Sequence, residues 1–239
     1  MRRVLSFSCL AILVMAMACG SGDMPNEDNS WTGANLRGQV KSVTEVGFQA
    51  TRQNGEWIKG ARNQTYSIKT YSPTGFIISE RRYYSDTNEF NSGFEYVYDE
   101  DGNVTRINAL DPEGNVSGFS DVQKRDGKVG IRQYTDFFGN GINSMATGST
   151  EMKWENHRLL ESKAYQITGD IISHVKYEYN SHGDVSKFII DNFGQGQKDV
   201  TINSTYLEFD EQDNWLRQLK EYEGYPVTEI VERRYEYYE

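Results

Sequence analysis

Apolar and polar residues alternate with a period of two along most of the chain. Residues 40–48, 200–206 and 231–237 each follow this pattern, and they are rich in Val, Ile, Thr and Tyr. Such alternation is typical of β-strands with one buried face. The best candidate for a helix, residues 210–222, contains Asp213-Asn214-Trp215, which fits a turn better. The pattern therefore predicts an all-β chain.

Turn sequences separate the predicted strands at intervals of roughly a dozen residues, as expected for short strands joined by hairpins. Asn54-Gly55 and Asp101-Gly102 are two of them, and both supply the positive φ that tight hairpins need. One strand per interval gives about thirteen to fourteen strands, whereas open sheets rarely exceed about 10 without curling. We expect an antiparallel β-meander of consecutive hairpins that forms one large, strongly twisted and coiled sheet. A two-sheet sandwich or barrel-like closure is the alternative.

Several of these hairpin units resemble one another in sequence. Residues 96–105 (YVYDEDGNVT) and 177–186 (YEYNSHGDVS) share two aromatic residues, an Asp or Asn, two variable residues and a Gly. Residues 69–77 and 207–215 are more divergent copies. In each unit an aromatic strand enters, Asp or Asn caps the turn through a local backbone bond, and Gly takes the left-handed conformation.

This shared form resembles the YD (tyrosine–aspartate) repeat, also called the RHS-type repeat, over most of residues 66–215. Residues 36–44 and 213–237 resemble the corresponding ends of uncharacterised Bacteroidetes lipoproteins that carry such repeats. The resemblance implies a meander of β-hairpins, and in large RHS proteins a sheet that wraps into a shell. This chain lacks the many regular copies, the self-cleaving segment and the toxin tail of those proteins. We therefore do not expect it to enclose a cargo protein.

The first nineteen residues have the organisation of an exported segment. Arg2 and Arg3 precede an apolar run, and small residues flank Cys19. This arrangement resembles a bacterial lipoprotein signal, with Cys19 as the acylated first residue of the mature chain. The alternative is an ordinary secretory signal that leaves Cys19 as a free thiol. We expect a signal peptide at 1–18, a flexible tether at 19–34 and a single β-repeat domain at 35–239. The expected location is the bacterial cell envelope, as an outer-membrane lipoprotein that is periplasmic or surface-exposed.

The charge of the chain excludes one class of partner. The formal net charge is -10, and loss of Arg2 and Arg3 with the signal would make it more negative. Because an acidic surface repels phosphate backbones, we expect no nucleic-acid binding. The only cysteines are Cys9 and Cys19, so the predicted mature chain has no thiol available for a disulfide.

The sequence offers no catalytic or metal-binding motif. The histidines His157, His174 and His182 have no ligand spacing for zinc, and no cysteine can assist them. Phosphate-loop, dinucleotide and nucleophile-elbow motifs are absent. We expect no cofactor and no catalytic residue.

Two acidic turns are weak candidates for calcium. They contain Asp99 and Asp101, and Asp111 and Glu113, but they lack the full spacing of a calcium loop and its terminal bidentate glutamate. Acidic turn chemistry explains them without a metal, so we expect no metal site.

Exposed aromatic residues near turns are the remaining candidates for ligand binding. Trp57, Tyr84, Trp154 and Trp215 are the residues we select, although aromatic residues at i and i+2 more often form the core of a thin sheet. The sequence predicts a non-enzymatic envelope lipoprotein that binds a protein or glycan partner with its sheet. One alternative is a carrier of a lipid or other hydrophobic ligand, which requires an aliphatic hollow. The other is a glycoside hydrolase, which requires two facing carboxylates.

Overall fold

The structure is a computed structural model, and it describes residues 30–125, 128–135, 145–156, 158–166, 168–192 and 199–239. The described residues form one short helix, α2, and fourteen strands. Their bounds are α2 Ser30–Gly33, β1 Val40–Gln53, β2 Glu56–Tyr71, β3 Ile77–Tyr84, β4 Phe90–Tyr98, β5 Val104–Leu110, β6 Val116–Arg125, β7 Lys128–Thr135, β8 Met145–Glu155, β9 Arg158–Gln166, β10 Ile171–Tyr179, β11 Val185–Asn192, β12 Val200–Phe209, β13 Trp215–Tyr222 and β14 Thr228–Tyr237.

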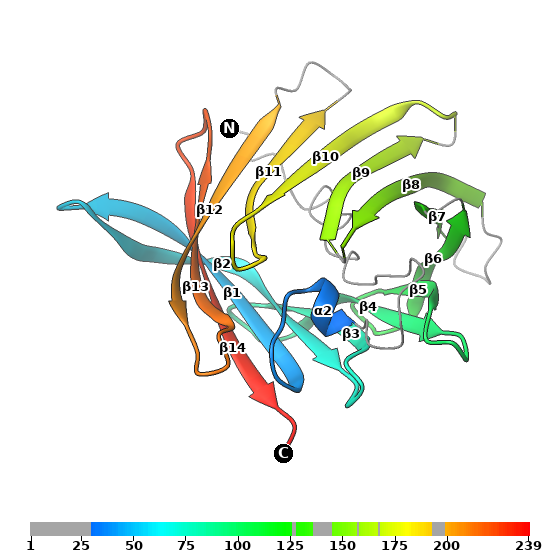
Figure 1. The fold of residues 1–239 in the computed structure, drawn as a ribbon, viewed down its shortest axis with the longest axis horizontal. Coiled ribbons are helices and arrows are strands. Elements are labelled where there is room, and N and C mark those ends of the chain that lie inside the picture. The colour runs from blue at the N-terminus through cyan, green and yellow to red at the C-terminus, as the bar shows by residue number, and fades with distance from the viewer. Residues whose placement is uncertain (1–29, 126–127, 136–144, 157, 167, 193–198) are drawn as a thin grey trace.

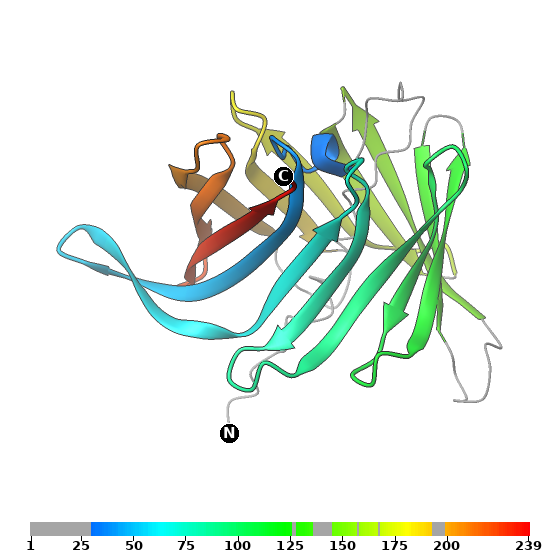
Figure 2. The ribbon, with the colours of Figure 1, turned by 90° about the horizontal axis from the view of Figure 1, so that it is seen from below.

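Each strand pairs antiparallel with the strand that precedes it, so the predicted meander of hairpins is confirmed. The last strand also pairs with the first, from Val40 opposite Tyr237 to Gln49 opposite Glu229. The order of strands therefore closes on itself, and the barrel-like alternative describes the sheet better than a two-sheet sandwich does. Figure 1 shows the strands arranged as a ring, and Figure 2 shows their strong twist. Pairing of β1 with β14 removes the two exposed edges that an open meander would leave.

The repeated turns have one geometry, which explains their shared sequence. In the turn between β4 and β5, the Asp99 carboxylate accepts hydrogen bonds from the backbone N–H groups of Asp101 and Asn103, and Gly102 has φ +80°. The turn at Asn180–Asp184 repeats the backbone bonds, and Gly183 has φ +88°. The Asp and Gly positions of the repeat are therefore set by local backbone chemistry.

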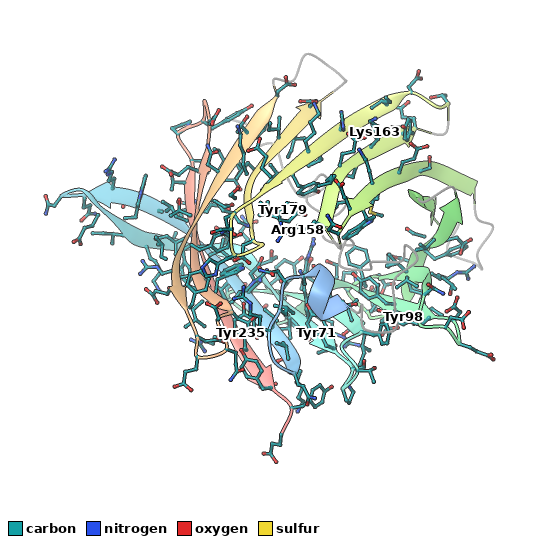
Figure 3. The ribbon with its side chains drawn as sticks, in the orientation of Figure 1. Tyr71, Tyr98, Arg158, Lys163, Tyr179 and Tyr235 are labelled. Carbon is teal, nitrogen blue, oxygen red and sulfur yellow. The ribbon has the colours of Figure 1, made fainter. Side chains whose placement is uncertain are left out.

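Four tyrosines, two of them the second aromatic residue of a repeat unit, have a structural function that the sequence did not reveal. Each hydroxyl donates a hydrogen bond to a backbone carbonyl about twenty residues earlier, near the start of the previous strand. The four pairs are Tyr98 to Ile77, Tyr179 to Leu159, Tyr206 to Val185 and Tyr235 to Trp215, at 2.7–2.8 Å. Each bond fastens one hairpin to the preceding one, and Figure 3 shows three of these tyrosines at separate places around the ring.

A segment before β1, residues 30–39, lies across the end of the ring where the repeated turns gather. The Ser30 hydroxyl accepts the Ile77 N–H at 2.9 Å, and Asn35 donates to the Asp184 carboxylate at 2.8 Å. Asn214 accepts the Arg37 N–H and donates to the Arg37 carbonyl, both at 2.8 Å. We call residues 30–39 the cap. Its first residues fall within the predicted tether, so the described fold begins before the predicted boundary at residue 35.

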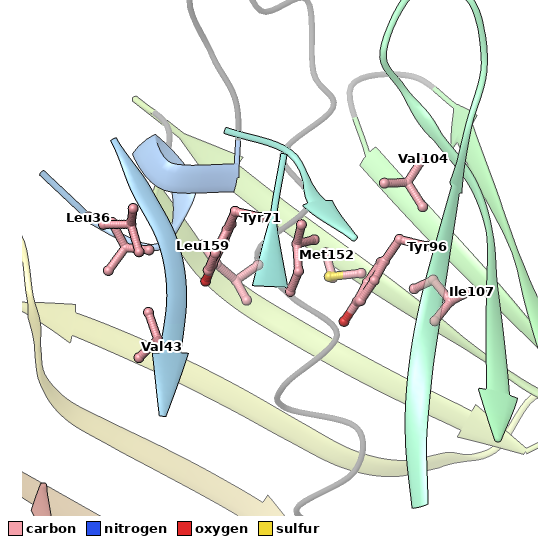
Figure 4. Close-up of a cluster of buried hydrophobic side chains, with 10 residues drawn as sticks. Leu36, Val43, Tyr71, Tyr96, Val104, Ile107, Met152 and Leu159 are labelled. Atoms are coloured by element: carbon pink, nitrogen blue, oxygen red, sulfur yellow. The ribbon is translucent and has the colours of Figure 1, made fainter. Parts of the chain in front are cut away.

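Hydrophobic side chains of distant strands meet inside the ring. One cluster joins Val43, Tyr71 and Ile77 from the first strands to Met152 and Leu159 of β8 and β9. Figure 4 shows Tyr71 beside Leu159 and Met152. A smaller cluster joins Val175, Ile190, Val200 and Ile202. The fully buried side chains are mostly aliphatic, and aromatic side chains such as Tyr98, Tyr177 and Tyr235 pack partly buried against them.

Candidate binding surface

Charged side chains, as well as hydrophobic ones, lie on the inner face of the sheet. Glu45 of β1 pairs with Arg233 of β14, with Arg233 Nη2 at 2.8 Å from Glu45 Oε2. The Arg233 guanidinium also covers the Trp215 ring at 3.8 Å from its centroid. Burial alone would raise the pKa of Glu45, but Arg233, assisted by Lys220 and Lys69, lowers it from 4.5 to about 2. This pair is therefore charged throughout the physiological range.

A second buried ion pair lies on the neighbouring strands. The Glu80 side chain of β3 is fully buried, and Arg82 Nη2 lies 3.2 Å from Glu80 Oε1. Lys69 of β2 lies at the edge of ion-pair distance, 4.0 Å from Glu80 Oε2. On the inner face, Arg158 of β9 also lies over the Tyr179 ring at 5.4 Å, and Figure 3 labels both residues. Charges of both signs therefore share the interior with the hydrophobic clusters.

Two open hollows in the described surface are lined by both polar and apolar groups. One of about 450 Å³ is lined by Asp199, Thr201, Glu223, Gly224 and Tyr225. The other, of about 410 Å³, is lined by Val97, Thr105, Arg106, Asn108 and Asp121. Each contains carboxylate groups, which are costly to cover with a hydrocarbon chain. Neither hollow has the aliphatic lining expected of a carrier for a hydrophobic ligand.

An ion-pair network that sequence reasoning missed crosses β9, β10 and β11. His174 Nε2 lies 3.2 Å from Glu161, and His174 Nδ1 lies 3.6 Å from Asp191. Burial alone would raise the pKa of Glu161, but hydrogen bonds from His174 and Lys163 lower it. Lys176 pairs with Asp191 at 3.3 Å, so both carboxylates have cationic partners. Only the strand register could have revealed this network.

The acidic turns proposed as weak calcium candidates use their carboxylates locally. The Asp99 carboxylate is occupied by N–H groups of its own turn, and Asp111 accepts the Asn115 N–H at 2.7 Å. The two turns lie at opposite ends of β5, so Asp101 and Glu113 are not brought together. Within the described residues, no group of three or more His, Cys, Asp or Glu side chains could hold a metal ion. His157 lies outside the described residues.

The four predicted ligand residues do not form one site. Trp215 is buried beneath Arg233, and Trp154 packs partly buried against the hydrophobic cluster. Tyr84 is 40% exposed at the end of β3. Trp57 lies near the tip of the hairpin formed by β1 and β2. Of the four, Tyr84 is exposed, whereas Trp57 and Trp154 are both half-buried.

The hairpin of β1 and β2 extends well beyond the sheet. Pairing of β2 with β3 ends at Thr65, and pairing of β1 with β14 ends at Gln49, but β1 and β2 remain paired to Gln53 and Glu56. Both ribbon views show this hairpin projecting from the ring (Figures 1 and 2). We call residues 49–64 the arm.

Cationic side chains of the arm lie over aromatic rings. The Arg52 guanidinium lies 5.8 Å from the Trp57 ring centroid, and the Lys59 ammonium lies 4.7 Å from that of Phe48. Strand alternation places Phe48 on the face opposite the hydrophobic cluster that contains Val43. Arg52, Trp57 and Lys59 share a face, because Trp57 pairs with Arg52 and lies two residues from Lys59.

The same pattern continues from the base of the arm across β2, β3 and β4. Arg62 lies 4.8 Å from the Tyr66 ring, which stacks on Tyr83 with centroids 5.4 Å apart. Tyr83 meets Phe90 edge to face at 5.9 Å, and Arg81 lies 5.7 Å from the Phe90 ring. We call the whole set the cation–aromatic band; it consists of Phe48, Arg52, Trp57, Lys59, Arg62, Tyr66, Arg81, Tyr83 and Phe90.

Comparisons with known proteins identify no family for this chain. No protein-family model matches it, and no curated protein matches its sequence. Within the described residues, no helix is long and apolar enough to cross a membrane.

Several solved structures show limited similarity. A porin-like protein from Bacteroides uniformis aligns with 9% identity over 82% of this chain and 96% of its own, with a TM-score of 0.36. The Tc holotoxin pore of Photorhabdus luminescens aligns with 11% identity over 75% of this chain and 12% of its own, with a TM-score of 0.27. A LolA superfamily protein from Nitrosomonas europaea aligns with 6% identity over 84% of this chain and 88% of its own, with a TM-score of 0.28. Similarity at this level assigns no function to this chain.

Proposed function

We propose that this chain is a non-enzymatic lipoprotein of the bacterial cell envelope that binds a glycan on its outer surface. Cys19 is its lipid attachment site, and residues 20–29 link the anchor to the folded body. The observation that carries the binding proposal is the cation–aromatic band, which places rings and cations on the arm and on the outer face beside it. Tyrosine and tryptophan combine an apolar ring with one polar group. They can therefore pack against a sugar ring while that group stays hydrogen-bonded to water.

The interior favours this function over transport of a hydrophobic ligand. Glu45 with Arg233, and Glu80 with Arg82, place charge on the inner face. A lipid chain offers these charged groups no hydrogen bonds, so they make the inner face a poor lining for such a ligand. The cap lies across one end of the ring and is held there by a hydrogen bond that Ser30 accepts and by others that Asn35 and Arg37 donate.

The test compares glycan binding with non-covalent lipid binding by the purified full chain. We expect it to bind glycans on an array of neutral and acidic polysaccharides. We also expect organic extraction of the chain to release no stoichiometric lipid besides the acyl chains bound covalently at Cys19. Recovery of about one non-covalent lipid per chain, with no glycan bound, would contradict the proposal and support the carrier. Capture of an envelope protein with no glycan bound would also contradict it.

A further inference from the structure

We propose that the cation–aromatic band binds an acidic polysaccharide, with carboxylate or sulfate groups contacting its arginines and sugar rings lying against its aromatic side chains. This inference rests on the proposed function and adds to it the binding site and the chemical class of the ligand.

The band concentrates positive charge on an acidic chain. The band contains four cations, Arg52, Lys59, Arg62 and Arg81, in a chain whose net charge is -10. Lys59 pairs with Glu232 at 2.8 Å, and Arg81 pairs with Glu95 at 3.4 Å.

The two remaining arginines are free to bind an anion. Arg52 donates to the Gly55 carbonyl at 3.4 Å, and Arg62 donates to the Ser85 carbonyl at 3.3 Å. Within the described part of the chain, neither has a carboxylate within 4.0 Å. Both side chains are exposed, so two guanidinium groups face solvent without an anionic partner.

The way these cations are held favours recognition of carboxylate or sulfate groups. A guanidinium that lies over an aromatic ring keeps the donors at its edge available, and its orientation is restricted before the ligand arrives. Arg52 lies over Trp57 and Arg62 lies over Tyr66 in this way. A planar guanidinium can donate two parallel hydrogen bonds to the two oxygens of a carboxylate or sulfate. A lysine ammonium group lacks this paired geometry.

The shape of the band favours a single extended polymer. Trp57 and Tyr66 lie nine residues apart on β2, which corresponds to about 30 Å along a strand. From Tyr66 the band crosses β2, β3 and β4 to Phe90, which adds roughly 10 Å at the usual strand spacing. A polysaccharide strand can follow such a narrow path.

The charge around the band disfavours broader anionic partners. Glu56, Glu95 and Glu232 lie beside it, and the rest of the chain has an excess of acidic residues. A duplex nucleic acid or an anionic membrane presents a wide surface of high charge density, which these carboxylates would repel. A flexible acidic polysaccharide can contact the cations and avoid the surrounding acids.

The test uses three polymers with one backbone, namely dextran, carboxymethyl-dextran and dextran sulfate, and the purified full chain. We expect both anionic polymers to bind more tightly than dextran, with an affinity that falls as salt is raised. The double variant Arg52→Gln/Arg62→Gln should weaken binding about tenfold or more, because each arginine loses charge-assisted hydrogen bonds. Trp57→Ala should weaken it as well, because the ring that orients Arg52 is removed.

The matched control is Lys153→Gln/Lys176→Gln, which removes the same charge from exposed positions on β8 and β10. It should leave binding within about twofold of the native chain, since neither lysine belongs to the band. Equal loss in both double variants would overturn the inference, because it would show an effect of net charge alone. Equal binding of dextran and dextran sulfate would also overturn it, while leaving the proposed function intact. Preferential binding of duplex DNA or anionic vesicles through Arg52 and Arg62 would replace the polysaccharide with another partner.

Discussion

The substitution Arg233→Met lowers the free energy of unfolding by about 3–5 kcal/mol, the usual cost of removing one partner of a buried ion pair. Glu45 and Arg233 have side chains that are 19% and 16% exposed, so removal of the cation leaves Glu45 largely desolvated. The same change also removes the guanidinium that lies 3.8 Å from the Trp215 ring. Urea denaturation at pH 7 measures the difference between the two chains.

A second variant separates the ion pair from simple loss of packing. Glu45→Gln/Arg233→Met removes both charges and should regain much of the stability that the single variant loses. If the double variant is as unstable as the single one, the interaction with Trp215 rather than the ion pair stabilises this region.

The pH dependence of stability gives an independent measure of the same pair. The pKa of Glu45 is lowered in the folded chain from 4.5 to about 2, so the charged form is the one that stabilises the fold. Its contribution, about 3 kcal/mol by linkage, is fully present above pH 4.5. It is lost as the pH falls from 4.5 towards 2. The difference in stability between the native chain and Glu45→Gln should therefore narrow over this interval. A difference that stays constant would contradict the lowered pKa.

Ile77→Ala lowers the free energy of unfolding by about 3 kcal/mol, within the range for truncation of a fully buried side chain. The Ile77 side chain has no exposed surface and lies in the larger hydrophobic cluster. Its backbone N–H donates to Ser30 of the cap, and its carbonyl accepts the Tyr98 hydroxyl. A cavity at this position therefore weakens the hydrophobic cluster and also the two backbone hydrogen bonds to Ser30 and Tyr98.

The neighbouring residue provides the control for this experiment. Ile78 is 50% exposed, so Ile78→Ala should change the stability by less than about 0.5 kcal/mol. Thermal or urea unfolding of the two alanine variants compares the same chemical change at adjacent positions. Equal effects at the two positions would contradict the inward orientation of Ile77.

The strands and their turns could be predicted from the sequence because both depend on local chemistry. Alternating apolar residues define the strands. The residues that define a turn, such as Asp99 and Gly102, lie within five positions of one another in the sequence. Closure of the sheet depends on pairs such as Thr44 with Arg234, which are far apart in the chain. No local pattern indicates such a pair, so the sequence left closure as one of two alternatives.

The candidate site was predicted less well than the fold. The sequence predicts Trp57 as a candidate but not the side chains that surround it, because these lie across the hairpin and the register of β1 and β2 shifts near Phe48. An irregularity of this kind changes which side chains meet and cannot be read from alternation alone. Trp154 and Trp215 were selected because they lie near turns. The structure places both against inward-facing neighbours, with Trp215 beneath Arg233.

Closure of the sheet is the structural claim on which the positions of the cap and the arm depend, and residue-resolved amide hydrogen exchange tests it most directly. Between Val40 and Gln49, the backbone N–H groups of β1 point alternately towards β2 and towards β14. In the closed sheet both sets should exchange as slowly as those of β12, which lies between two strands. The N–H groups of β14 that face β1 should be equally protected. Rapid exchange confined to the N–H groups that join β1 and β14 would show two free edges and contradict the closed sheet.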